Sequence, residues 1–158
     1  MPSTIYNPGD VILGFAKLKG WNLKKRSVMV EGDNDVAYFE LIAKLYLKKT
    51  GLDLIGKDLS IFSAGTGKQG GTKAIFDEYP SLMNIIRSDV NQNGKILFRV
   101  IALVDNDNAG RTLRNNMLHQ YKQLRNNAHI FVLQRIFPRT TSEPNSLTKQ
   151  IEKYGSSD

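Results

Sequence analysis

The sequence contains no cysteine, only two histidines, and no apolar run long enough to cross a bilayer. Without cysteine, disulfides, thiolate nucleophiles and cysteine-based zinc or iron–sulfur sites are excluded. A transmembrane helix needs about 20 consecutive apolar residues. The opening MPSTIYNPGD also lacks the charged region and apolar core of a signal peptide. These absences predict a cytoplasmic protein without a membrane partner.

The 158 residues suffice for one domain with a sizeable core. The composition, 41% apolar and 23% charged, is typical of a folded globular chain. The formal net charge of +7 favours an anionic partner, with nucleic acid first among them. An excess of this size also serves solubility alone, so charge leaves the partner open.

Apolar runs alternate with amphipathic segments along most of the chain. The pattern predicts strands at 27–31, 59–64, 96–104 and 128–136, and helices at 35–49, 73–87 and 109–126. Strands separated by helices form right-handed crossovers and a mostly parallel sheet. We therefore expect a compact, Rossmann-like α/β domain, with about four mainly parallel strands flanked by helices. Residues 1–25 are a lead-in, 26–137 form the domain, and 138–158 are a tail with a short helix.

Acidic residues follow two of the predicted strands. Glu31 ends the first strand, and Asp105 and Asp107 follow the third as a D-x-D pair, while Asp35 falls in the next helix's first turn. Ligands of open α/β sheets bind beyond the carboxyl ends of the strands. Carboxylate oxygens gathered there suit Mg²⁺ or Mn²⁺, which take further ligands from water and substrate phosphates.

A structural interpretation of the same residues stays open. Asp33 and Asp35 are suitable helix caps or partners of a helix dipole, and Asn108 is a suitable cap for the third crossover helix. Gly32 is expected to let the backbone turn sharply after Glu31. For any one acid the structural role is the more common, but four acids at two strand ends favour a metal site.

Three sharper motifs fail on inspection. DNDNAG begins like a calcium loop, but Asn116 stands where an EF-hand requires a bidentate glutamate. In GTGKQGG the residue after Gly70 is Gly71, where a Walker A phosphate loop requires lysine. The backbone N–H groups of this segment could still meet a phosphate. Ala109 departs from the D-x-D-x-T/V pattern of aspartate-nucleophile phosphatases, which weakens that alternative.

VMVEGDND (28–35) and ALVDNDNAGR (102–111) together resemble the Toprim domain. That domain is shared by topoisomerases, bacterial primases, ribosomal-RNA maturases and the overcoming-lysogenization-defect (OLD) nucleases. The resemblance covers roughly residues 26–137, and E-G-x-x-D is closest to the OLD nucleases. It implies that Glu31 is a general acid/base or metal ligand and that Asp105 and Asp107 are metal ligands. Asp35 matches the acid that helps hold a second metal in those nucleases.

The resemblance implies a Mg²⁺- or Mn²⁺-dependent nuclease acting on nucleic acid, with DNA expected ahead of RNA. Lys68, Lys73 and Arg111 lie beside the same sheet edge and are candidates for binding phosphate oxygens. The chain has no room for the ATPase domain of an OLD nuclease, so a separate ATPase subunit or missing domain is an expected partner. Two alternatives remain: a metal- and nucleic-acid-binding module without turnover, and a primase-like or RNA-maturase-like Toprim domain.

Overall fold

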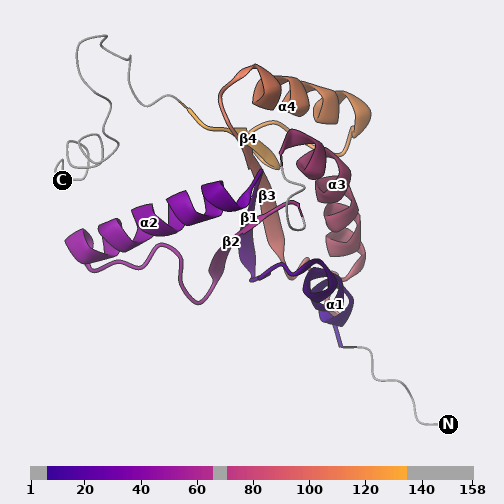
Figure 1. Cartoon of the computed structure of the whole chain (residues 1–158). Coiled ribbons are helices and arrows are strands. Elements are labelled where there is room, and N and C mark those ends of the chain that lie inside the picture. The colour runs from indigo at the N-terminus through magenta and orange to yellow at the C-terminus, as the bar shows by residue number, and fades with distance from the viewer. Residues whose placement is uncertain (1–6, 66–70, 135–158) are drawn as a thin grey trace.

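The structure is a computed structural model that describes residues 7–65 and 71–134 (Figure 1). Eight elements follow one another along these residues. In order they are α1 (Asp10–Lys19), β1 (Arg26–Val30), α2 (Asp33–Thr50), β2 (Leu59–Ser63), α3 (Thr72–Ser88), β3 (Arg99–Val104), α4 (Asn108–Gln120) and β4 (Ile130–Val132).

The four strands form one parallel sheet in the order β2-β1-β3-β4, which confirms the predicted α/β fold. From β1 the chain passes outward to β2, and from β3 it passes outward in the opposite direction to β4. The strand order therefore reverses between β1 and β3. In open α/β sheets the crevice beyond such a reversal is where ligands bind, and here Glu31 and Asp105 follow the two strands that flank it.

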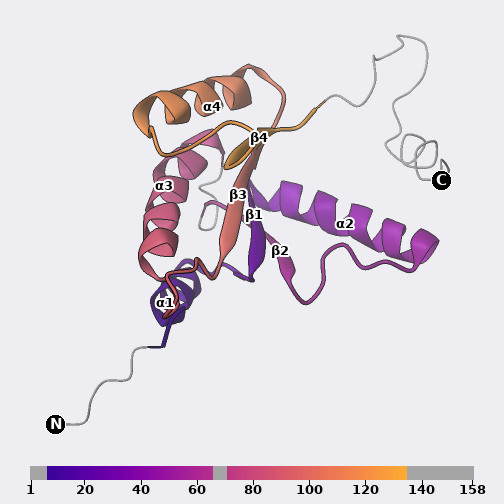
Figure 2. The same cartoon turned by 180° about the vertical axis from the view of Figure 1, so that it is seen from behind.

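The two faces of the sheet are covered unequally. Met29 pairs in register with Phe62 and Ala102, and all three side chains are buried in the core shared with α1, α3 and α4. Val28, one residue earlier, belongs to the other face and is only half-buried. That face carries α2 alone, which stands apart from the other three helices in both views (Figures 1 and 2).

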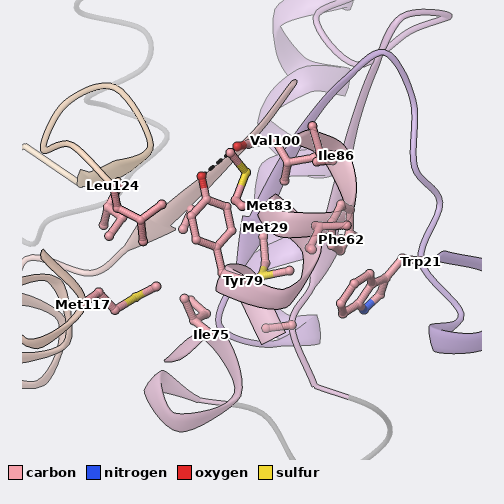
Figure 3. Close-up of a cluster of buried hydrophobic side chains, with 14 of the residues drawn as sticks. Trp21, Met29, Phe62, Ile75, Tyr79, Met83, Ile86, Val100, Met117 and Leu124 are labelled. Atoms are coloured by element: carbon pink, nitrogen blue, oxygen red, sulfur yellow. Dashed lines mark hydrogen bonds between the residues drawn. The ribbon is translucent and has the colours of Figure 1, made fainter. Parts of the chain in front are cut away.

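The core on the three-helix side is built from α3 and the aromatic side chains beside it (Figure 3). Tyr79 is fully buried, and its hydroxyl lies 2.8 Å from the carbonyl oxygen of Val100 and 3.0 Å from that of His129. Trp21 stacks on Phe62 with ring centroids 5.0 Å apart. These contacts join the segment before β1 to the sheet and fix α3 against β3.

Helix α1 is the element that the sequence analysis missed, because residues 1–25 were expected to be only a lead-in. Ile12 and Ala16 of α1 are buried in the core. Its N-terminus has no side-chain cap of its own, and Asp89 accepts hydrogen bonds from the backbone N–H groups of Gly9 (2.9 Å) and Ile12 (3.2 Å). This acceptor lies about 80 residues away in the chain, so the local sequence contained no capping signal.

Three predicted boundaries were too generous. β3 begins at Arg99 instead of residue 96, because Ile96 forms an antiparallel bridge with Val90 across a turn. α4 ends at Gln120, six residues before the predicted end, and Leu124 beyond it is buried as part of a turn. β4 covers Ile130–Val132, less than the described part, 128–134, of the predicted 128–136, and residues 135–136 lie outside the described residues. The predicted tail, 138–158, lies outside the described residues.

Helix α2 packs loosely for its length. Of its 18 residues only Ala43 is buried, whereas Leu41 and Leu45 are exposed. Helix α2 is therefore held mainly through its contacts with β1 and β2.

Within residues 7–65 and 71–134, no helix combines the length and apolar composition needed to span a membrane.

Candidate functional site

The parallel strands end at the carboxyl edge of the sheet. Among the acids at this edge, Glu31 lies deepest in the protein. It follows β1 directly and is half-buried. Its Oε1 atom is buried and has no hydrogen-bond partner among the described residues. A buried oxygen without a partner costs free energy, so this position is unfavourable for a carboxylate unless a proton, a cation or a donor joins it.

The pKa of Glu31 is raised above its usual value. Burial is the largest cause, and the charges of Asp105, Asp35 and Asp107 add to it. A hydrogen bond from the backbone of Asp105 acts in the opposite direction without cancelling the rise. These causes place Asp35, Asp105 and Asp107 within electrostatic reach of Glu31.

Asp105 follows β3 and is exposed, yet its pKa is also raised, first by desolvation and then by the charges of Asp35 and Asp107. Tyr38, one helical turn after Asp35, has a raised pKa because it is partly desolvated and lies near Asp105. Tyr38 is not among the site residues that the sequence predicts. Its three-residue spacing from Asp35 was the available signal, since such residues share a helix face.

Asp107 has a structural role in addition to its place in the acid group. It is the N-cap of α4, and its Oδ1 accepts a hydrogen bond of 2.7 Å from the backbone N–H of Gly110. The sequence analysis proposed Asn108 for this cap, but Asn108 is the first residue inside the helix. The cap fixes one oxygen of Asp107 and leaves the other for a further partner.

Gly110 is required by close packing at the start of α4. A Cβ atom built at this position would lie 2.1 Å from the carbonyl oxygen of Asp105, far inside contact distance. The first turn of α4 therefore presses directly on the backbone that carries Asp105. Any side chain at Gly110 would move the helix, the D-x-D loop, or both.

Asp35 is also engaged with the backbone. Its Oδ2 accepts a hydrogen bond of 3.0 Å from the N–H of Gly32, closing the start of α2. Gly32 lies in the bend between β1 and α2, as predicted, but its backbone is extended, with φ −151°, a conformation that any residue could adopt. Asp33 accepts a hydrogen bond from the hydroxyl of Ser63 at the end of β2.

The predicted basic residues differ in their surroundings. Arg111 donates from Nη1 to the carbonyl oxygen (3.1 Å) and Oδ1 (2.8 Å) of Asn106, and from Nη2 to Oδ1 of Asn108 (2.6 Å). It thus braces the loop between the two acids. Lys73 lies in the first turn of α3, exposed and ion-paired with Asp77. Lys68 lies outside the described residues.

The acids fit a hard divalent cation by donor chemistry, although their side chains are not gathered as a finished cage. In residues 7–65 and 71–134 no three Asp, Glu or His side chains already lie close enough together to hold a metal ion. Mg²⁺ commonly binds through one or two protein carboxylates, with waters and substrate phosphates completing its shell. Glu31, with its orphaned Oε1, and Asp105, whose charge acts on it, are the two carboxylates with the chemistry for such a site.

We compared the chain with protein-family models, with curated proteins and with solved structures, and none of the three comparisons found a match.

Proposed function

We propose that the protein is a Mg²⁺- or Mn²⁺-dependent nuclease of Toprim type that cleaves phosphodiester bonds in nucleic acid. The observation that carries the proposal is Glu31, whose buried oxygen lacks a partner in a group of acids beside the reversal of strand order. A purely structural carboxylate would be expected to have its buried oxygens satisfied. The Toprim-like motifs VMVEGDND and ALVDNDNAGR support the same assignment.

In this proposal Glu31 and Asp105 hold the cation. Asp107 and Asp35 cap their helices and add negative charge near the cation. A bound cation would polarise the scissile phosphate and screen its developing charge. Without a cation the pKa of Glu31 is raised, and a bound cation would lower it by favouring the ionised carboxylate, the form that can accept a proton. Glu31 accepts a proton from water as the water oxygen bonds to phosphorus, and the bond from phosphorus to the leaving oxygen breaks, with solvent protonating that oxygen.

Positive groups near the acids support an anionic substrate. The chain carries a net charge of +7, which raises the local concentration of nucleic acid around it. Arg111 and Lys73 flank the acids from the first turns of α4 and α3. In the proposal Arg111 chiefly positions the D-x-D loop, whereas Lys73, held only by a surface ion pair, is available to a phosphate. DNA is the substrate that we test first, with a separate ATPase subunit as the expected partner.

A cleavage assay tests this function. The full chain is incubated with end-labelled single-stranded DNA, double-stranded DNA and RNA, in Mg²⁺, in Mn²⁺ and in EDTA. We expect cation-dependent cleavage that Asp105→Asn abolishes and that Asp58→Asn, a change at an exposed aspartate away from the acids, leaves unchanged. Cleavage that persists in Asp105→Asn would indicate a contaminating nuclease, and the absence of cleavage in every condition would contradict the proposal.

The alternative of a binding module without turnover makes a different prediction in the same assay. It predicts retention of nucleic acid by the wild-type chain without products in either cation. Because Asp107 and Asp35 already cap helices, this alternative gives two of the four acids a complete structural explanation. A bound cation would satisfy the buried oxygen of Glu31 in either case, so the formation of products in the assay decides between the two functions.

A further inference from the structure

A groove of about 650 Å³ lies between α3 and α4, beside the acids. The two helices are in contact, with α4 crossing above the upper end of α3 in both views (Figures 1 and 2). The α3 wall includes Thr72, Lys73, Phe76 and Asp77, the last ion-paired with Lys73, and the α4 wall includes Asn108, Thr112 and Leu113. A groove of this volume matches the size of sites that hold small molecules or single nucleotides.

Both walls of the groove begin at the acid group. On the α4 side, Asn108 directly follows Asp107. On the α3 side, Thr72 directly follows Gly71, whose backbone N–H donates a 2.9 Å hydrogen bond to the carbonyl oxygen of Glu31. A strand whose phosphate lay at Glu31 would therefore have a neighbouring residue at the mouth of the groove.

The lining combines two kinds of surface. Leu113 is buried in the core and Phe76 packs against it, so together they form an apolar base. Thr72 and Thr112 add hydroxyl groups and Asn108 adds an amide, all of which can hydrogen-bond the edge of a base or a sugar. An apolar base with a few polar groups is typical of a site that takes a flat heteroaromatic group.

The mouth of the groove favours negative charge in spite of the nearby acids. The first turns of α3 and α4 both open there, and the N–H groups of a first helical turn have no acceptor within the helix. The start of α4 is already capped by Asp107, whereas the N-cap of α3 makes no side-chain hydrogen bond, so α3 offers the better anion site. Lys73 adds a mobile cation, because its side chain is 85% exposed and its ion pair with Asp77 is a surface contact. The groove thus offers anion-binding groups at its mouth and an apolar base further in.

We propose that the groove between α3 and α4 binds one nucleotide of the nucleic-acid strand, adjacent to the phosphate held at the acids. The phosphate of this nucleotide lies at the helix starts near Lys73, and its base lies over Phe76 and Leu113. The inference rests on the proposed function for the identity of the strand. It assigns to the chain a specificity-determining surface separate from the acids that act on the phosphate.

A matched pair of charge substitutions on α4 tests the groove. Thr112→Glu places a carboxylate inside it, whereas Asn115→Glu places the same charge on the same helix at an exposed position outside its lining. Both are made in a Glu31→Gln background with Mg²⁺, so that the strand stays intact, and circular dichroism checks their folding. Affinity for a fluorescein-labelled 12-nucleotide single-stranded DNA is read by anisotropy.

We expect Thr112→Glu to weaken binding by about tenfold or more, and Asn115→Glu by less than about threefold, since only the first puts a carboxylate against the bound strand. Equal losses in the two variants would mean that only overall charge matters, which would overturn the groove. If equal losses accompany cation-dependent cleavage by the wild type, the groove is wrong and the nuclease stands. A selective loss in Thr112→Glu without any wild-type cleavage leaves the nucleotide site and removes the nuclease.

Amide chemical shifts of the wild-type chain separate a nucleotide from a bare phosphate. Thymidine 5′-monophosphate is expected to move the amide signals of both the helix starts, Lys73 and Asn108, and the apolar base, Phe76 and Leu113. Ribose 5-phosphate and inorganic phosphate are expected to move only the signals of the helix starts. Identical shift patterns for all three probes would show a phosphate site alone and would overturn the assignment of the base to this groove.

Discussion

Asp89 and Glu31 are two carboxylates that the fold withdraws from solvent at opposite edges of one sheet. Asp89 caps α3 at the edge where the strands begin, is 3% exposed, and accepts hydrogen bonds from two backbone N–H groups of the α1 segment. Glu31 lies where the strands end, is less buried, and keeps one buried oxygen without a partner among the described residues. The more deeply buried acid is the better satisfied.

The same contrast extends to the neighbours of each acid. At the edge where the strands begin, Ser27 and Ser60 are buried and hydrogen-bond each other at 2.8 Å. At the opposite edge, the negative charges of Asp105 and Asp107 raise the pKa of Glu31, because they repel its carboxylate and do not neutralise it. At one edge the buried Asp89, Ser27 and Ser60 find partners within the chain, whereas the other edge gathers like charges that a cation would neutralise.

The largest expected effect is on stability at the complete edge. Asp89→Ala leaves two buried N–H groups at the start of α1 without their acceptor and removes a favourable charge from a helix N-terminus. We expect the free energy of unfolding to fall by about 2–4 kcal/mol. Urea unfolding followed by circular dichroism measures it, with Asp58→Ala as the exposed control, expected within about 0.5 kcal/mol of wild type. A loss no larger than that of the control would show that the contacts of Asp89 are dispensable.

The second prediction concerns chemistry at the incomplete edge. Glu31→Gln keeps the shape of the side chain and loses its charge and basicity, so cleavage is expected to fall by about 100-fold or more, the scale of general acid–base catalysis. In EDTA the same variant is expected to be at least as stable as wild type, because it relieves repulsion among the carboxylates. Glu40→Gln, at an exposed glutamate of α2, is the matched control for both measurements. A large loss of stability with unaltered cleavage would make Glu31 a structural residue like Asp89.

The third prediction tests whether a cation completes the edge. Saturating Mn²⁺ is expected to stabilise the wild-type chain by about 1–2 kcal/mol, the effect of a ligand present at roughly ten to thirty times its dissociation constant. Asp105→Asn is expected to lose this gain while keeping its fold, and Asp89→Asn is expected to keep the gain on a less stable protein. Thermal unfolding with and without Mn²⁺, together with calorimetric titration, measures both. Equal stabilisation of the Asp105→Asn variant would place the cation elsewhere.

These two edges also differ in how far the sequence reveals them. Glu31, Asp105 and Asp107 follow apolar strands, and parallel strands bring their carboxyl ends to one edge, so the acid group could be predicted from the order of elements alone. The cap of α1 could not, because Gly9 and Asp89 meet only after the chain has folded. The double use of Asp107 was equally hidden, since helix capping and metal binding favour the same residue type.

The boundaries show the same limit on a smaller scale. Ile96 belongs by composition to the apolar run of β3, but the turn before it pairs it with Val90 instead. Arg111 was assigned to phosphate because of its charge and position, and its hydrogen bonds to Asn106 and Asn108 show a contact that spacing alone does not report. The local sequence pattern indicates whether each element is a helix or a strand. Tertiary contacts determine where the element ends and what its side chains touch.

The smallest expected effect is the pH dependence of stability in the metal-free protein. Folding raises the pKa of Glu31 above its usual value, so the folded state binds its proton more tightly than the unfolded chain does. The stability due to this group is therefore fully present below the unfolded pKa and is lost as pH rises from about 4 towards neutrality. Because other groups contribute to the pH dependence as well, the useful quantity is the difference between wild type and Glu31→Gln. In EDTA, the stability of wild type relative to the variant is expected to decrease as pH rises, by less than about 1 kcal/mol because solvent screens a half-buried group.

With saturating Mn²⁺ the trend should reverse, since the ionised carboxylate is the form that binds metal. A metal-free difference that stays flat across this range, or that increases with pH, would mean that the surroundings of Glu31 already compensate its charge, as those of Asp89 do.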